Sequence, residues 1–387
     1  MTAAISPDGL EKRLPENDDP ATPDRNTNFE ITPIPAIVYC ANCMDSTRGK
    51  TAHGLIRFTE RFDVRAVVDP IFAGQDAGTF LDGSPNGIPI LATLAEAVDR
   101  LPGPGGVFVV GLATDGGVLP PDARVAVARA ISHGLDIYSG LHVFLSEDHD
   151  LVNLAKLHGV SLVDVRKPPH RSELHFYEGK VKEVQSVRVL VLGTDSASGK
   201  RTTAWMLRNA LKSRGYSAEM IGTGQTAWMQ GARFGILLDS LVNDFVAGEI
   251  EHVVRKAWCE AAPDVIIVEG QGALLHPAYP GGLELVASVK PDVILLQDVP
   301  ARKTFDGFDH LPMPPMMRQI QALELLADRL VAAITVNPNG LTPEESKSIC
   351  ASYEQMFGRP TIDVIREGCD RLIDILEDHL RTRKPIG

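Results

Sequence analysis

The sequence contains few cysteines, only five in 387 residues. They are too few and too scattered to build a disulfide scaffold. Two of them form a C-x-x-C pair with no second pair to complete a zinc site, so we expect buried, reduced thiols. The five residues are Cys40, Cys43, Cys259, Cys350 and Cys369.

Long apolar runs and clustered basic residues are also missing. No apolar run reaches the roughly 18 residues that a membrane-spanning helix needs, and the N-terminus lacks the basic-then-apolar pattern of a secretory signal. The net charge is -12 with no long basic stretch, which disfavours nucleic acid and anionic membranes as partners. We therefore expect a cytoplasmic protein that binds a small molecule, for which a local positive site suffices.

The composition that is present is typical of an α/β protein. Hydrophobic residues make up 44% of the chain, with 34 glycines and 27 prolines, as tight strand–helix turns require. Short β-branched runs alternate with helical stretches over residues 33–164, and again over residues 187–387. This alternation predicts two parallel-sheet domains. We expect residues 165–186, which begin with a basic, proline-rich stretch, to link them and the polar residues 1–32 to form a disordered arm.

Hydrophobic periodicity places the individual elements. In the first domain we expect strands at 36–39, 64–68, 107–110, 137–138 and 160–163, and helices at 50–58, 91–100, 122–133 and 151–158. In the second domain we expect strands at 188–192, 218–221, 265–269, 293–297, 331–336 and 361–364. The helices expected there are 199–214, 249–261, 317–327, 343–357 and 369–380.

The strongest functional signal is a loop of small residues between the strand expected at 188–192 and the helix expected at 199–214. Small residues let backbone N–H groups converge on phosphate oxygens, and the helix N-terminus adds a favourable dipole. We therefore expect a nucleotide, or another ligand that carries adenosine diphosphate, to bind here. The expected phosphate-binding residues are Gly193, Thr194, Asp195, Ser196, Ala197, Ser198, Gly199, Lys200, Arg201, Thr202 and Thr203.

This loop departs from the common pattern G-x-x-x-x-G-K-[ST]. Thr194 stands at the first glycine position, and Arg201 stands where the magnesium-binding hydroxyl belongs. Both ends of the loop resemble those of dethiobiotin synthetase. In an ATP-dependent ligase or kinase, Thr202 and Glu269, at the end of a neighbouring strand, would hold Mg²⁺. Gln225 falls where another loop would contact the same ligand.

Several motifs together resemble one bacterial family with an N-terminal Rossmann-like domain and a C-terminal P-loop domain. They are Lys50–Leu55, Ser139–His142, Asp164–Pro169, the Gly193–Thr203 loop and Glu269–Gly272. The resemblance implies this two-domain fold. One branch of the family consists of D-glutamate N-acetyltransferases, which use acetyl-CoA and act with a partner dehydrogenase. The resemblance therefore implies transfer of an acetyl group from acetyl-CoA to the amine of D-glutamate or a related D-amino acid.

An acetyltransferase of this kind needs cations for two substrate carboxylates and a base that takes a proton from the substrate ammonium. The pantetheine chain spans roughly 15 Å when extended, so we expect the reaction centre in the cleft between the domains. The candidate cations are Arg48, Lys50 and Arg166. The candidate bases are Asp45, His53 and His142. For both histidines a hydrogen-bonded structural role is the alternative, and for Arg166 it is a solvated linker.

Other interpretations stay open from the sequence. A nucleotide-gated regulator would bind nucleotide tightly without turnover. NAD binding by the first domain is disfavoured, because no G-x-G-x-x-G follows its first strand. Asp239 and Asp244 are weaker metal candidates, for which a helix cap or a solvated face is the simpler interpretation. We expect a homo-oligomer, since parallel α/β enzymes of this size often associate.

Overall fold

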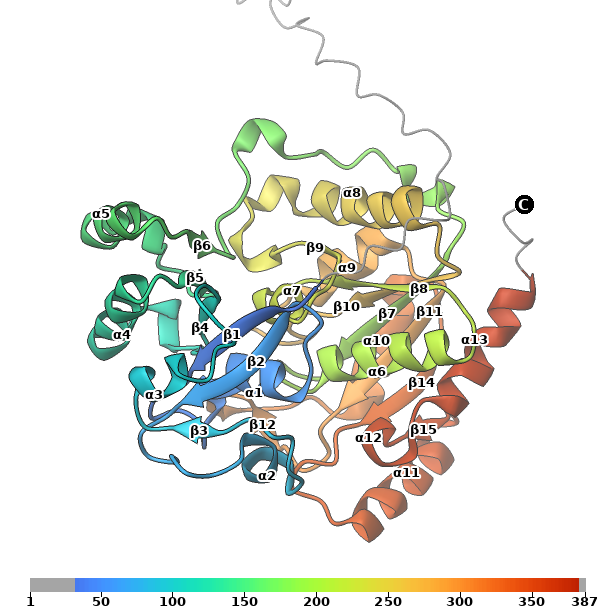
Figure 1. Cartoon of the computed structure of the whole chain (residues 1–387). Helices are drawn as coiled ribbons and strands as arrows, with labels where there is room; N and C mark the ends of the chain where they lie inside the picture. The colour runs from blue at the N-terminus through green and yellow to red at the C-terminus, as the bar shows by residue number, and fades with distance from the viewer. Residues whose placement is uncertain (1–31, 383–387) are drawn as a thin grey trace, which may run out of the picture.

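The computed structural model describes residues 32–382. The disordered arm predicted for residues 1–32 lies outside the described residues, except for Thr32. Two α/β domains lie side by side, the N-terminal one in blue to teal and the C-terminal one in green to red (Figure 1). Among the described residues, no helix is both long enough and apolar enough to cross a membrane.

The N-terminal domain is built on a six-stranded parallel sheet with the order β3-β2-β1-β4-β5-β6. This is the strand order of dinucleotide-binding folds, in which ligands bind beyond the carboxyl ends of the strands. The strands are β1 Ile34–Tyr39, β2 Phe62–Val68, β3 Ile90–Leu91, β4 Val107–Val110, β5 Asp136–Ser139 and β6 Leu162–Asp164. The helices are α1 Lys50–Arg57, α2 Ala77–Asp82, α3 Leu94–Val98, α4 Pro121–Ser132 and α5 His149–His158.

The C-terminal domain has a seven-stranded parallel sheet with the order β15-β14-β11-β7-β10-β8-β9. Its strands are β7 Val187–Gly193, β8 Ala218–Gly222, β9 Phe234–Gly235, β10 Val265–Glu269, β11 Val293–Asp298, β14 Val331–Val336 and β15 Thr361–Ile362. A separate antiparallel hairpin consists of β12 Thr304–Phe305 and β13 Phe308–Pro312. The helices are α6 Lys200–Ser213, α7 Gln225–Met229, α8 Asn243–Ala261, α9 Gly282–Val289, α10 Met316–Ala327, α11 Pro343–Phe357, α12 Val364–Glu367 and α13 Asp370–Thr382.

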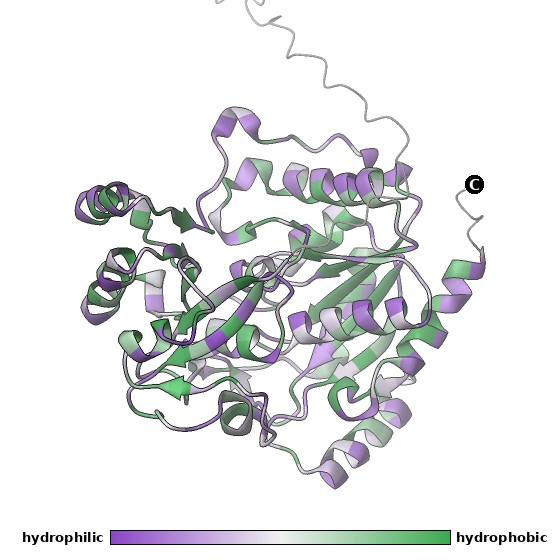
Figure 2. Ribbon diagram, in the orientation of Figure 1, coloured by the Kyte–Doolittle hydropathy of each residue, from purple (hydrophilic) through white to green (hydrophobic). Residues whose placement is uncertain are grey.

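The central strands form the core of each domain. All seven residues of β7 are buried, as expected for a parallel strand covered by helices on both faces. Figure 2 shows hydrophobic strands inside and hydrophilic outer faces on the helices. Each fully buried valine or leucine contributes roughly 1.5–3 kcal/mol to folding. These two cores fix the strands, and so fix where the loops at the strand ends lie.

Most predicted elements are present, although several bounds differ: α8 begins at Asn243, well before the predicted start at residue 249. Leu91 was expected in a helix but belongs to β3, because the capping box of Thr93 and Glu96 starts α3 at Leu94. Val364 was expected in a strand but begins α12, whose first turn is capped by the Asp363 carboxylate. Short elements were missed because their apolar patterns are brief. They are α2, α7, α9, α12, β3, β9 and the β12–β13 hairpin.

The segment predicted as a linker, residues 165–186, lies along α8 in its second half. The Glu249 carboxylate accepts the backbone N–H of His175 at 2.7 Å. The Glu251 carboxylate accepts the N–H groups of Glu178 at 2.6 Å and Val181 at 2.8 Å. Val181 is buried in the core of the C-terminal domain. Charged acceptors on α8 therefore fix this part of the segment to the C-terminal domain.

The two domains pack directly against each other through α1 and α7 (Figure 1). The buried amide of Gln230 donates to the backbone carbonyls of Gly54 at 2.9 Å and Phe58 at 3.0 Å. A Cβ at Gly54 would lie 2.8 Å from the Thr226 side chain and 2.9 Å from the Arg201 guanidinium. Glycine therefore allows the close approach of α1 to the Arg201 side chain of α6 and the Thr226 side chain of α7.

Candidate functional site

The predicted phosphate loop is a turn between β7 and α6. Lys200, the first residue of α6, is only 6% exposed. Its ammonium donates to the Asp195 carbonyl at 2.6 Å and contacts the Ser198 hydroxyl at 3.3 Å. Burial lowers the pKa of Lys200 to about 8, although Glu269 and Asp195 oppose the shift. The loop thus holds a cation whose own charge is costly, and an anionic ligand would relieve that cost.

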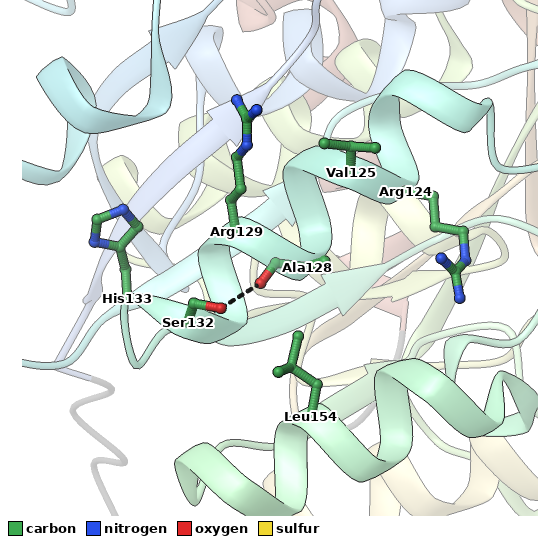
Figure 3. Close-up of a pocket in the computed structure, with 7 residues that line it drawn as sticks. All are labelled: Arg124, Val125, Ala128, Arg129, Ser132, His133 and Leu154. Carbon is green, nitrogen blue, oxygen red and sulfur yellow. Dashed lines mark hydrogen bonds between the residues drawn. The ribbon is translucent and has the colours of Figure 1, made fainter.

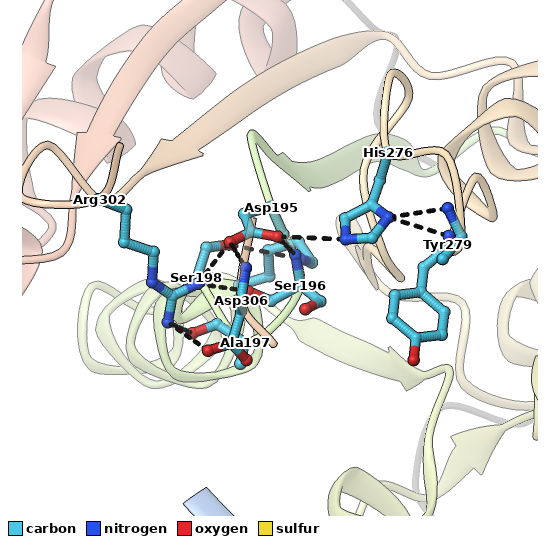
Figure 4. Close-up of polar contacts among 10 residues, drawn as sticks. Asp195, Ser196, Ala197, Ser198, His276, Tyr279, Arg302 and Asp306 are labelled. Carbon is cyan, nitrogen blue, oxygen red and sulfur yellow. Dashed lines mark hydrogen bonds and ion pairs between the residues drawn. The ribbon is translucent and has the colours of Figure 1, made fainter. Parts of the chain in front are cut away.

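Internal hydrogen bonds shape the loop (Figure 4). The Asp195 carboxylate accepts from the N–H of Ser196 at 2.6 Å, from Arg302 at 2.8 Å and from the N–H of Asp306 at 2.9 Å. Arg302 also donates to the carbonyls of Ser196 at 2.8 Å and Ala197 at 3.2 Å. Ala197 has φ +45°, a left-handed conformation that costs about 1–2 kcal/mol. Arg302 therefore acts as a clamp that holds the loop in a strained shape.

The hydroxyls of the loop are also engaged. Thr194 donates to Asp298 at 2.7 Å, and Thr203 donates to the Gln297 side chain at 2.5 Å. Thr202 is exposed on α6. These three threonines were predicted to bind phosphate or metal, and the structure shows that the hydroxyls of Thr194 and Thr203 bond to the end of β11.

Arg201 lies beside Glu269 at the interface with α1. The Glu269 carboxylate is buried and accepts the N–H of Thr223 at 3.0 Å. Burial raises its pKa, and the positive charges of Arg201 and Lys200 oppose the rise. In P-loop enzymes that use Mg²⁺, an acid at this place helps to hold the metal. Here a guanidinium stands where the metal-binding hydroxyl belongs, so two cations, Lys200 and Arg201, follow each other at the start of α6.

A second cluster lies between the domains and is centred on Arg166. Its guanidinium donates to the Gly140 carbonyl at 2.6 Å and to the Gln225 side chain at 2.7 Å, and it forms an ion pair with Asp239. Arg166 is 8% exposed. Gly140 comes from the end of β5, Gln225 begins α7, and Asp239 lies in the 3₁₀ turn Leu238–Ser240. The solvated-linker interpretation of Arg166 is therefore wrong.

Lys50 and His142 border this cluster. Lys50 is partly in contact with solvent, but the protein around it lowers its pKa. The positive charges of Arg201 and Arg166 lower this pKa further, whereas the negative charge of Asp306 raises it. Burial and the Arg166 charge lower the pKa of His142, and Asp239 raises it. His142 is therefore neutral near pH 7 and able to accept a proton. The structure brings together five residues predicted from separate segments, Lys50, His142, Arg166, Arg201 and Gln225.

Three other predicted residues lie apart from this cluster. Arg48 is exposed and pairs with Asp115 at 2.5 Å. His53 has its Nε2 atom 2.8 Å from the Met44 carbonyl, so that nitrogen carries a proton, and the ring has the structural role that was the alternative. Asp45 is exposed, and its charge acts on the thiols of Cys40 and Cys43.

Sequence reasoning missed three residues of these sites, Asp239, His276 and Arg302. Asp239 was considered as a weak metal candidate, a helix cap or a solvated residue, because nothing near it in the sequence points to Arg166. Arg302 and His276 lie in loops after β11 and β10, far along the chain from the phosphate loop. Their only sequence signal is their position beyond the carboxyl ends of parallel strands.

Two further observations concern the rest of the described structure. Within residues 32–382, no group of three or more His, Cys, Asp or Glu side chains is arranged to hold a metal ion. A shallow hollow lies on the outer side of α4, facing α5 (Figure 3). Two of its polar side chains are engaged within the domain: Arg124 pairs with Asp148, and Ser132 donates to the Ala128 carbonyl at 3.1 Å. The functional side chains gather at the strand ends instead.

The chain resembles known proteins along most of its length. It is 32% identical over 273 residues to a D-glutamate N-acetyltransferase from Pseudoalteromonas sp, which covers 69% of this chain and 80% of that protein. It is 31% identical over 275 residues to a D-glutamate N-acetyltransferase from Tritonibacter scottomollicae, with 70% and 80% covered.

A crystal structure of a DUF1611 family protein from Anabaena variabilis superposes with a TM-score of 0.82 at 30% identity, covering 89% of this chain and 99% of that one. Residues 70–168 match the Rossmann-like N-terminal domain of DUF1611, which is described as a domain of unknown function. Residues 175–373 match its C-terminal P-loop domain. The chain is therefore a member of the DUF1611 family, as the sequence motifs predicted.

Proposed function

We propose that the protein transfers an acetyl group from acetyl-CoA to the amine of D-glutamate or a related D-amino acid. The names of the two enzyme relatives support this proposal. The observation that carries it is the placement of Arg201, which gives the P-loop a cation in place of a metal-binding hydroxyl and lies against α1 near Glu269. A P-loop of this kind suits the binding of phosphates without phosphoryl transfer.

The donor phosphates would bind at the P-loop. Coenzyme A carries a diphosphate and a 3′-phosphate, and the loop N–H groups with Lys200 and Arg201 match that charge. The pantetheine chain would then lead the thioester away from Lys200 towards the inter-domain cluster. The charges that act on Lys50 include Asp306 and Arg201 near the phosphate loop and Arg166 and Asp239 of the cluster, which supports a route past Lys50.

The acceptor would bind among Lys50, Arg166 and Asp239. Two cations and one carboxylate are complementary to an amino acid with two carboxylates and one ammonium group. A substrate carboxylate would compete with Asp239 for the Arg166 guanidinium. We propose that Asp239, once released, faces the substrate ammonium.

His142 is the base that the structure favours among the three candidates. It would take a proton from the ammonium, and the amine nitrogen would then attack the thioester carbonyl carbon. As the new C–N bond forms, the C–S bond breaks and the sulfur leaves as the thiolate of coenzyme A. The second proton of the attacking nitrogen neutralises that thiolate, so the products are the N-acetyl amino acid and the thiol.

The direct test mixes the purified protein with acetyl-CoA and D-glutamate and follows thiol release and the acetylated product. We expect turnover that EDTA does not change, and a loss of about 100-fold or more in His142→Ala. Two control acceptors are assayed beside D-glutamate: L-glutamate, which differs only in chirality, and D-aspartate, which differs only in chain length. No acetylated product with any acceptor, together with Mg²⁺-dependent ATP cleavage, would replace this proposal with the ligase or kinase alternative.

The role of Arg201 has its own test. We expect Arg201→Ala to weaken coenzyme A binding about 10-fold or more in calorimetry, and to weaken binding of the analogue without the 3′-phosphate much less. Equal losses for both ligands would show that Arg201 does not recognise that phosphate. The partner dehydrogenase and the homo-oligomer remain predictions.

A further inference from the structure

His276 is a buried histidine next to the phosphate loop. It follows β10 in the chain and is 1% exposed. Its Nδ1 atom accepts the backbone N–H groups of Ala278 and Tyr279, both at 3.1 Å. A nitrogen that accepts two N–H donors carries no proton, so the proton of the neutral ring must be on Nε2. The turn thus fixes the tautomer.

The Nε2–H group of His276 has no hydrogen-bond partner among the described residues. It points at the phosphate loop, where its nearest charged neighbour is the Asp195 carboxylate at 3.6 Å (Figure 4). That distance is too long for a hydrogen bond, and Asp195 already accepts from Ser196, Arg302 and Asp306. A buried donor without a partner costs about 1–3 kcal/mol, so its presence calls for an acceptor.

Aromatic contacts hold the ring in this orientation. The His276 ring centroid lies 4.4 Å from that of Phe305, 4.9 Å from that of Tyr279 and 5.5 Å from that of Phe308. Phe305 and Phe308 belong to the β12–β13 hairpin, which continues from the loop that carries Arg302. The hairpin therefore helps to position both Arg302, which holds the phosphate loop, and the Nε2–H group of His276.

We propose that the Nε2–H group of His276 donates to an oxygen of the anionic group bound at the P-loop. The inference rests on the proposed phosphate-binding role of this loop, and deepens it by adding a ligand-contacting residue from outside the motif. The charged groups that face the ring are Asp195, Lys200 and Asp306. Burial lowers the pKa of His276, and Asp195 opposes the shift. The ring is thus a neutral donor, which adds a directed hydrogen bond without adding charge.

Two variants separate this role from a structural one. In His276→Asn the side-chain oxygen can still accept from the turn, as Nδ1 does, but the distal donor is lost. In His276→Gln the amide N–H can reach the position of Nε2, but the turn loses its acceptor. We expect the Asn variant to bind ADP and coenzyme A about 10-fold or more weakly and to melt at a higher temperature than the Gln variant, because both lose the ring but only Asn keeps the acceptor for the turn. We expect the Gln variant to bind within about threefold of the original chain and to melt at a lower temperature.

The measurement is calorimetric titration with ADP, coenzyme A and inorganic pyrophosphate. Wild-type affinity for all three ligands in His276→Asn would overturn the inference, as would equal losses in both variants. NMR of the ¹⁵N-labelled original chain gives a readout that needs no mutation. We expect the Nε2–H signal to shift when pyrophosphate is added, and a signal that does not move would also overturn it.

The outcomes distinguish this inference from the proposed function. If the protein binds ADP but not coenzyme A, and His276→Asn weakens ADP binding, the donor role stands and acetyl transfer from acetyl-CoA falls. If coenzyme A binds and its binding depends on Lys200 but not on His276, the proposed function stands and this inference falls.

Discussion

The phosphate loop and the inter-domain cluster are built in different ways. The loop is one contiguous segment, and its carbonyls and carboxylate are held by partners within the C-terminal domain, chiefly Arg302. The cluster takes Lys50 and His142 from one domain and Asp239 and Gln225 from the other, with Arg166 joining them. The loop therefore depends on a single sheet, whereas the cluster exists only when both domains are docked.

This difference suggests a division of labour. A site rigidly shaped within one domain suits a constant recognition element, such as the phosphates of the acetyl donor. A site assembled at an interface can change when the domains or a single ion pair rearrange, which suits a variable acceptor. The comparison predicts that variants can damage one site and leave the other intact.

The largest effect is expected from Arg166→Ala. This change leaves Asp239 without its partner and removes the proposed carboxylate contact, so we expect kcat/KM for D-glutamate to fall about 1000-fold. Binding of ADP at the phosphate loop is expected to change by less than about twofold. The two measurements are steady-state kinetics and calorimetry on the same preparation.

The matched control is Arg166→Lys, which keeps the charge but loses the paired donors of the guanidinium. We expect it to recover only part of the lost activity. If Arg166→Ala weakened ADP binding as strongly as acetyl transfer, the two sites would not be independent, and the comparison would be broken.

A smaller effect, at the phosphate loop and not at the inter-domain cluster, is expected from Arg302→Ala. Without the clamp, the strained loop at Ala197 is free to relax, so we expect ADP affinity to fall about 10- to 30-fold through the loss of charge-assisted hydrogen bonds. KM for the acceptor is expected to stay within about twofold, because Arg302 lies outside the Arg166 cluster. Arg302→Lys retains the charge without the fork, so intermediate affinity would confirm that geometry matters. An unchanged ADP affinity in Arg302→Ala would show that the loop keeps its shape unaided.

The same contrast explains how far the sequence could predict the molecule. Strands at 107–110, 265–269 and 331–336 were predicted with their observed bounds, because each is a short, largely buried run whose signal is local. The phosphate loop was found for the same reason. The Arg166–Asp239 pair joins residues 73 positions apart, and no local pattern marks such a partner. The pairing of Arg166 with Asp239 depends on the strand order and on how the domains dock, and tertiary packing sets both.

The pH dependence of ligand binding tests whether the charge of Lys200 controls the affinity of the phosphate loop for anions. The free site has Lys200 with a pKa of about 8, and a bound anion raises that pKa because it favours the charged form. Affinity is therefore expected to be constant well below pH 8 and to fall above it, to about one-tenth at pH 9. ADP is a suitable probe, because its phosphates lose their last protons near about pH 6. The measurement is calorimetry across pH 6.5–9.5.

Two variants test whether Lys200 causes the fall in ADP affinity above pH 8. Lys200→Arg keeps a charge over the whole range, so its affinity profile is expected to be flat. Lys50 also has a lowered pKa, so Lys50→Arg serves as the control and is expected to keep the slope. A slope that survives in Lys200→Arg and disappears in Lys50→Arg would assign the titration to the inter-domain site.

The smallest effect is expected from the C-x-x-C pair in the turn after β1, whose thiols have no hydrogen bond or ion pair with the phosphate loop or the Arg166 cluster among the contacts of the described residues. Burial raises the pKa of Cys40 and of Cys43, although Arg48 opposes the shift at Cys43. A raised pKa leaves less thiolate, the reactive form, so both thiols should react with iodoacetamide more slowly than a free cysteine. Cys43→Ala is expected to keep acetyl transfer within about twofold. Asp45 acts on these thiols and not on the Arg166 cluster, so Asp45→Asn is also expected to keep acetyl transfer within about twofold. Rapid labelling of Cys43, or loss of turnover in either variant, would place the end of β1 in the active site.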